Sequence, residues 1–134
     1  MYNCRRKYSR NRRWQNCCVC LTFSSKGQQT RPNMLEMRPS CENCDKQLTN
    51  ESSEAMICTH ECTYCETCVN EVLKNVCPNC GGGFEKRPSR PTNCFTPNCV
   101  TNYPVSTVRK HRPVNWEKYK PIQDTFVTID PRKR

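Results

Sequence analysis

The sequence predicts a small α+β fold that depends on bound metal and is flanked by disordered basic tails. Three observations lead to this prediction. Eight of the 14 cysteines lie in closely spaced groups between Cys41 and Cys80. Only 34% of the residues are hydrophobic, so the chain has little apolar surface to offset the entropy lost on ordering. The central block also contains a short apolar run followed by a segment with helical periodicity.

Charge divides the chain into parts. Residues 1–33 carry eight basic and no acidic side chains, and we expect a disordered basic extension there. Residues 41–80 carry seven acidic and two basic groups, whereas residues 81–134 carry four acidic and eleven basic ones. We therefore predict a two-zinc cysteine-rich domain at 34–90 and a proline-rich, extended basic tail at 91–134.

Within the central block, "EAMIC" (Glu54 to Cys58) is typical of a short strand before a turn, which predicts a β-hairpin. After Cys65 comes one short helix of about three turns. Its apolar face consists of residues at helical spacing, Val69, Val72, Leu73 and Val76. The Cys77-Pro78 step ends this helix, and the glycines of "CGGGF" allow a sharp turn after it.

The C-terminal part is rich in proline, which disfavours long helices and favours an extended path. The prolines recur at Pro88, Pro91, Pro97, Pro104, Pro113, Pro121 and Pro131. "TFVTI", Thr125 to Ile129, has the composition of a short strand, although an isolated strand is only marginally stable.

Cysteine spacing is the strongest chemical signal in the sequence. The predicted metal ligands are Cys41, Cys44, Cys58, Cys62, Cys65, Cys68, Cys77 and Cys80. Eight thiolates are what two closed tetrahedral zinc sites require. Because the block lacks enough large apolar residues to close a conventional core, we expect its folding to depend on two structural Zn²⁺ ions.

Two divisions of these ligands remain open. In the sequential scheme, the first four cysteines bind one ion and the last four bind the other. In the cross-braced scheme, Cys41, Cys44, Cys65 and Cys68 share one ion, while the other four share the second. We favour the cross-brace, because about 12 Å of helix rise between Cys68 and Cys77 makes it hard for them to share one ion.

The remaining histidines and cysteines receive no metal role. His60 is a spare donor that would stand in for Cys62, but we expect an exposed turn histidine, and we expect His111 to be solvated. No role is assigned to the other cysteines, Cys4, Cys17, Cys18, Cys20, Cys94 and Cys99.

The central block resembles a known bacterial family, domain of unknown function twelve-seventy-two. The similarity covers about Met34 to Pro113 and lies in the cysteine series with "EAMIC", "CPNCGG" and "YPVSTVRKHRP". This resemblance implies a zinc-binding treble-clef or RING-like module without an assigned activity. It also implies a usual start at the position of Met34, which would make residues 1–33 a mis-called start or a lineage extension. It implies no family ligand at Cys94 or Cys99.

We expect a non-catalytic module that binds an unknown protein partner or has a structural role, and no small-molecule substrate. Ubiquitin-ligase activity is disfavoured, because RING ligases usually place an aliphatic residue where Asn43 stands and often a basic one where Gly81 stands. The basic tails would also suit weak nucleic-acid binding, and the thiolates would suit a redox switch, but we favour neither function.

The start of the chain lacks the apolar run of a signal peptide, and the sequence has no apolar stretch long enough to span a membrane. Metal-bound thiolates therefore point to a cytoplasmic location.

Overall fold

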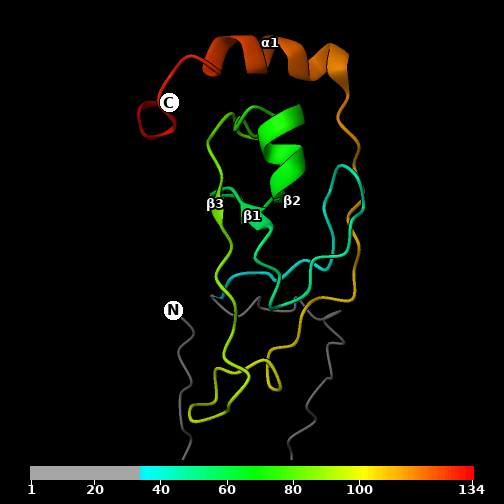
Figure 1. Ribbon diagram of the computed structural model, residues 1–134, viewed down its shortest axis with the longest axis vertical. Coiled ribbons are helices and arrows are strands. Elements are labelled where there is room, and N and C mark those ends of the chain that lie inside the picture. The colour runs from blue at the N-terminus through cyan, green and yellow to red at the C-terminus, as the bar shows by residue number, and fades with distance from the viewer. Residues whose placement is uncertain (1–33) are drawn as a thin grey trace, which may run out of the picture. The chain divides into compact units, whose positions relative to one another are not determined.

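The computed structural model describes residues 34–134, which belong to one compact unit, Asn33–Arg134. The extension expected at 1–33, with its four cysteines, lies outside the described residues. Along the chain the elements are β1 (Ala55–Ile57), β2 (Thr63–Cys65), η1 (Cys68–Val72), β3 (Glu85–Lys86), α1 (Trp116–Phe126) and η2 (Pro131–Lys133) (Figure 1).

The sheet is antiparallel and has β1 at its centre, in the order β2-β1-β3. β1 and β2 form the predicted hairpin, in which Met56 is the partner of Tyr64. On the other side of β1, Met56 pairs with Lys86 of β3. The short strand expected in "EAMIC" is confirmed, and the hairpin holds both ends of its turn in fixed register.

The predicted helix after Cys65 is present but shorter than three turns, and its main part, η1, is a π-helix. It stops because Lys74 and Asn75 take left-handed backbone angles, with φ of 50° and 58°. The side chain of Asn75 stabilises this turn by accepting a hydrogen bond from Phe84 N at 2.8 Å. The apolar face is as predicted, since Val69, Leu73 and Val76 are fully buried.

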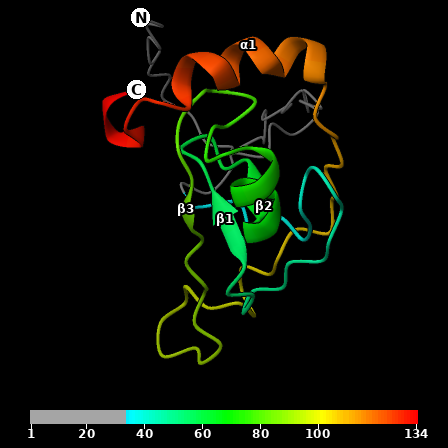
Figure 2. The same cartoon turned by 45° about the horizontal axis from the view of Figure 1, so that its top comes forward.

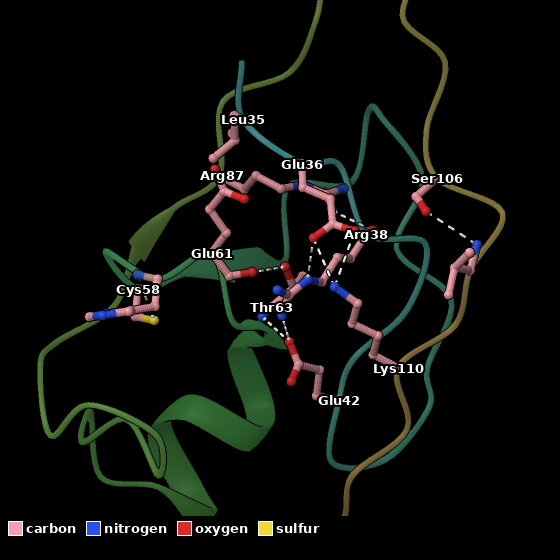
Figure 3. Close-up of polar contacts among 12 residues, drawn as sticks. Leu35, Glu36, Arg38, Glu42, Cys58, Glu61, Thr63, Arg87, Ser106 and Lys110 are labelled. Carbon is pink, nitrogen blue, oxygen red and sulfur yellow. Dashed lines mark hydrogen bonds and ion pairs between the residues drawn. The ribbon is translucent and has the colours of Figure 1, made fainter. Parts of the chain in front are cut away.

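A buried ion network fastens the N-terminal segment of the described chain to the sheet (Figure 3). The carboxylate of Glu42 pairs with Arg38 and accepts a hydrogen bond from the N–H of Thr63 in β2 at 2.9 Å. Glu36 contacts Arg38 and, at 2.9 Å, the ammonium of Lys110. Segments far apart in the sequence are thereby tied to one another and to β2.

Arg87, directly after β3, holds backbone rather than a carboxylate. Its guanidinium donates to the carbonyls of Arg38 and Thr49, at 2.6 Å each, and to that of Leu48 at 3.3 Å. Burial lowers the pKa of Arg87 because it disfavours the charged form. The planar fork of guanidinium donors offsets this cost by bonding three carbonyls that lie outside the strands.

The C-terminal part differs from the expected extended tail. Residues 116–126 form α1, which begins at the N-cap Asn115, whose side chain accepts from Lys118 N at 3.2 Å. Pro121 lies inside this helix, and Thr125 and Phe126 end it, so the strand expected at 125–129 is wrong. None of the helices described in residues 34–134 is long and apolar enough to cross a membrane.

α1 is stable here because it packs on the cysteine-rich block, as Figures 1 and 2 both show. Tyr119 is 2% exposed, and its hydroxyl donates to the carbonyls of Leu73 at 2.7 Å and Val76 at 2.9 Å. Gln123 Nε2 donates to the carbonyl of Val72 at 3.0 Å. Side chains of α1 therefore donate to the backbone carbonyls at and beyond the end of η1. The compact unit thus continues past the boundary expected at residue 90.

Candidate metal centres

The eight predicted ligands all lie in the described region, and seven of them gather in two groups of sulfur atoms. The first group consists of Cys41, Cys44, Cys65 and Cys68, whose Sγ atoms all lie within 4.8 Å of one another. Cys44 Sγ and Cys65 Sγ are 3.7 Å apart. Cys65 ends β2 and Cys68 begins η1, so the strand-to-helix junction presents one cysteine pair to the other.

The second group consists of Cys58, Cys62 and Cys77, all buried and within 4.8 Å of one another. Cys58 and Cys62 close the turn of the β1–β2 hairpin, where the N–H of Cys58 donates to the carbonyl of Cys62 at 3.2 Å. Cys80 is exposed and is grouped with Cys58 and His60. The structure thus brings the cysteines together in the cross-braced division rather than the sequential one.

The two Cys-x2-Cys loops at 41–44 and 77–80 fold in the same way. The N–H of the residue after the second cysteine donates to the carbonyl of the first, from Asp45 to Cys41 at 2.9 Å and from Gly81 to Cys77 at 2.8 Å. In each loop that residue has a left-handed backbone, with φ of 59° at Asp45 and 72° at Gly81. The N–H of the first cysteine donates in turn to the carbonyl of the residue after the left-handed one. These bonds run from Cys41 to Lys46 and from Cys77 to Gly82, at 2.8 Å each. This repeated turn directs paired sulfurs to one point.

The thiols differ in acidity. Burial raises the pKa of Cys41 to about 11 and also raises the pKa of Cys68. Hydrogen bonds from Cys58 and Cys77 lower the pKa of Cys62 to about 2, while the same contact with Cys62 raises the pKa of Cys58 to about 11. The thiols whose pKa is raised would ionise at neutral pH only beside a cation, so metal binding to them should release protons.

The geometry of the sulfurs fits a tetrahedral ion. Four sulfurs bonded to zinc at about 2.3 Å lie about 3.8 Å from one another. The distance of 3.7 Å between Cys44 and Cys65 matches this value. The first group therefore supplies a complete four-sulfur donor set, and the second supplies three sulfurs with Cys80 and His60 nearby.

Asn43 contacts both the first sulfur group and the C-terminal segment. In the sequence it is notable only because RING ligases usually have an aliphatic residue at this position. Its Nδ2 donates to Cys68 Sγ at 3.3 Å, and its Oδ1 accepts from Val114 N at 3.1 Å. Its carbonyl oxygen lies 3.1 Å from His111 Nε2, so His111 contacts the loop although it is exposed. The position where a RING ligase would contact its partner is thus engaged by this chain's own C-terminal segment.

Two other cysteines have a separate structural role. Cys94 and Cys99 form a disulfide that closes a short loop, and the exposed side chain of Phe95 projects from it. The spacing of these two cysteines carries no metal-knuckle signal, and the reducing location expected from the sequence disfavours a disulfide.

Comparisons with known proteins place these cysteines in a wider group. The profile of a family described as protein of unknown function (DUF1272) matches residues 34–90, which include all eight cysteines of the two clusters. An uncharacterized protein of Rhizobium meliloti (strain 1021) is 46% identical over 80 residues, covering 60% of this chain and 89% of that protein. No solved structure matches the chain.

Proposed function

Because this chain belongs to the DUF1272 family of proteins of unknown function, we propose a role from its own geometry: a two-zinc, non-catalytic module that serves as a structural or protein-interaction domain. The observation that carries the proposal is the pair of interleaved sulfur clusters, each served by the same Cys-x2-Cys turn. Thiolates are soft donors that select zinc among the common divalent ions of cells.

The order of the elements supports a treble-clef or RING-like arrangement. A metal-knuckle turn at 41–45 is followed by the β1–β2 hairpin and then by η1, whose first residue is a ligand candidate. The second knuckle, at 77–81, brings Cys77 to Cys58 and Cys62 at the hairpin turn, which supports two interlocked sites.

A non-catalytic role agrees with the donors present. In the part of the chain described, the two clusters contain cysteine and His60 and no carboxylate. A catalytic zinc site usually keeps an open position beside three protein ligands, with a base nearby. Four sulfurs fill the first site, and Cys80 or His60 can complete the second.

Metal analysis tests this proposal. Purified protein should contain two zinc ions per chain, and removal of zinc with a strong chelator should unfold residues 34–134. Cys65→Ser should lower the content to one ion, whereas Ser40→Ala, which changes no ligand, should leave it at two. A folded protein without metal would overturn the proposal.

A partner surface is suggested by the uncharged segment 91–108. It has no Asp, Glu, Lys or Arg, although 25% of the whole chain is charged. Phe95, on the loop closed by the Cys94–Cys99 disulfide, is 95% exposed. Interfaces between proteins are depleted in charge and enriched in aromatic anchors, and a closed loop loses less entropy on binding. This loop and α1 lie at opposite ends of the unit (Figure 1).

A protein partner is better supported than a nucleic acid. Several cations of the C-terminal region are already engaged within the unit. Arg109 pairs with Asp45, Lys110 with Glu36, and Arg134 donates to backbone carbonyls. Affinity capture with wild-type protein, Phe95→Ala and Cys65→Ser would test the proposal, because a specific partner should be lost with both variants. Salt-sensitive binding to DNA or RNA that both variants retain would favour a nucleic-acid partner instead.

A further inference from the structure

Two further donors, Cys80 and His60, lie beside Cys58 of the second group, whose three sulfurs leave one position of a four-coordinate ion to be filled. Cys58, Cys62 and Cys77 form a buried triad of sulfurs. Cys80 Sγ and a ring nitrogen of His60 both lie within 4.8 Å of Cys58 Sγ and of each other. The first centre has no such surplus, since among the described residues its group contains four cysteines and nothing else.

His60 belongs to the metal centre rather than to a remote turn. Its own N–H donates to Cys58 Sγ at 3.3 Å, and its Nδ1 lies 3.4 Å from Thr59 Oγ1. From the sequence, His60 would bind metal in place of Cys62. In the structure, His60 is instead grouped with Cys58 and Cys80. Cys62 is buried within the triad and stays there whichever fourth donor binds.

Both surplus donors are exposed and face the same space. Cys80 and His60 are exposed and line one pocket of about 400 Å³, together with Gly81, Phe126 and other residues. The three sulfurs of the triad are buried, whereas the side chains of Cys80 and His60 are exposed. The exposed side of the centre is therefore the side on which a ligand can be exchanged.

We propose that Cys80 and His60 alternate as the fourth ligand of the second centre, an inference that rests on the proposed metal-binding function. In the exchange, the bond from zinc to the Cys80 sulfur breaks and a bond to an imidazole nitrogen of His60 forms. No electron is transferred, and the released thiolate takes a proton from solvent. The metal then has three sulfurs and one nitrogen, a donor set common in structural zinc sites. The released Cys80 thiol becomes available to alkylating or oxidising reagents while the ion stays bound.

The matched comparison is between the two exposed cysteines, Cys44 in the first centre and Cys80 in the second. Each is the exposed cysteine of its group, but only Cys80 has a spare donor beside it. In protein reconstituted with Co²⁺, Cys80→Ser should still bind two ions, with weaker sulfur-to-cobalt charge-transfer absorption. Cys44→Ser should bind one ion tightly. Adding His60→Ala to Cys80→Ser should weaken the second ion by at least about tenfold.

The outcomes separate this inference from the proposed function. A wild-type chain that binds no Co²⁺ would overturn the proposed function itself. Two ions in the wild type but only one in Cys80→Ser would overturn the inference alone. So would a double variant that binds as tightly as Cys80→Ser, or a third ion per chain, which would mean that His60 and Cys80 hold an ion of their own.

Alkylation of the wild-type zinc protein gives a second measurement that needs no ligand substitution. Iodoacetamide should modify Cys80 while both zinc ions stay bound, whereas modification of Cys44 should release one ion. In His60→Ala, modification of Cys80 should also release an ion. Equal release of zinc on Cys80 modification with and without His60 would overturn the exchange.

Discussion

Replacing Tyr119 with Phe tests whether α1 is an integral part of the unit that contains the cysteine clusters. The substitution keeps the ring, which is 2% exposed, and removes only the hydroxyl. That hydroxyl lies 2.7 Å from the carbonyl of Leu73 and 2.9 Å from that of Val76, and it accepts a weaker contact from Gln123 at 3.4 Å. The carbonyl of Val76 would lose this donor, whereas that of Leu73 would keep the N–H of Val76 at 3.0 Å.

The expected cost follows from this geometry. A hydroxyl has one proton, so the two contacts amount to one hydrogen bond shared between two acceptors. Leaving a buried polar group without a partner costs about 1–3 kcal/mol. We therefore expect Tyr119→Phe to lower the free energy of unfolding of the zinc-loaded protein by about 1–3 kcal/mol.

Denaturant unfolding, followed by circular dichroism at fixed zinc concentration, measures this loss. Tyr103→Phe is the matched control, since Tyr103 bonds through its backbone and no described residue pairs with its hydroxyl. Amide exchange should show faster opening of α1 in Tyr119→Phe alone. A change below about 0.5 kcal/mol, or an equal loss in both variants, would refute the view that this hydroxyl fastens α1.

Three further substitutions probe other contacts. Gly81→Ala should cost about 1–3 kcal/mol in denaturant unfolding, because the backbone is left-handed and the new Cβ would lie 2.8 Å from the ring of Phe126; unchanged stability would contradict this. Arg87→Lys should lower stability by at least about 1 kcal/mol, since one ammonium cannot replace a fork that spans three carbonyls, and a thermal melt equal to wild type would count against it. Burial alone would raise the pKa of Glu36, but hydrogen bonding to Lys110 and the nearby positive charges outweigh it and lower the pKa below 4.5. The stability that wild type has over Glu36→Gln should thus be present near neutral pH and disappear as pH falls below 4.5 through the folded-state pKa. A stability difference that is constant with pH would exclude the ionised Glu36 carboxylate as its source.

The cysteine-rich block was predictable because its signals are local. Cys-x2-Cys pairs define turns, "EAMIC" contains a short apolar run typical of a strand, and the spacing of Val69, Leu73 and Val76 marks a buried helix face. The length of η1 was overestimated, because residues 74 and 75 adopt left-handed angles that their identities, Lys and Asn, only weakly indicate.

α1 was missed because proline was given more weight than spacing. Tyr119, Ile122, Gln123 and Phe126 fall at i, i+3, i+4 and i+7, and Asn115 is a good N-cap. One of these positions is polar, and its role becomes clear only when the carbonyl of Val72 is seen beside it. Tertiary contacts therefore stabilise a helix that contains Pro121 and that propensity alone would reject.

The repeated knuckle turns have a consequence for how metal enters the protein. The chain visits the two centres alternately, so an ion bound by Cys41 and Cys68 already encloses the hairpin turn that carries Cys58 and Cys62. The first ion thus removes part of the loop-closure entropy that the second would otherwise have to overcome. If both centres hold zinc as proposed, titration with limiting zinc should then yield fewer half-loaded chains than two independent sites would, so that loading of the module would respond more steeply to zinc supply.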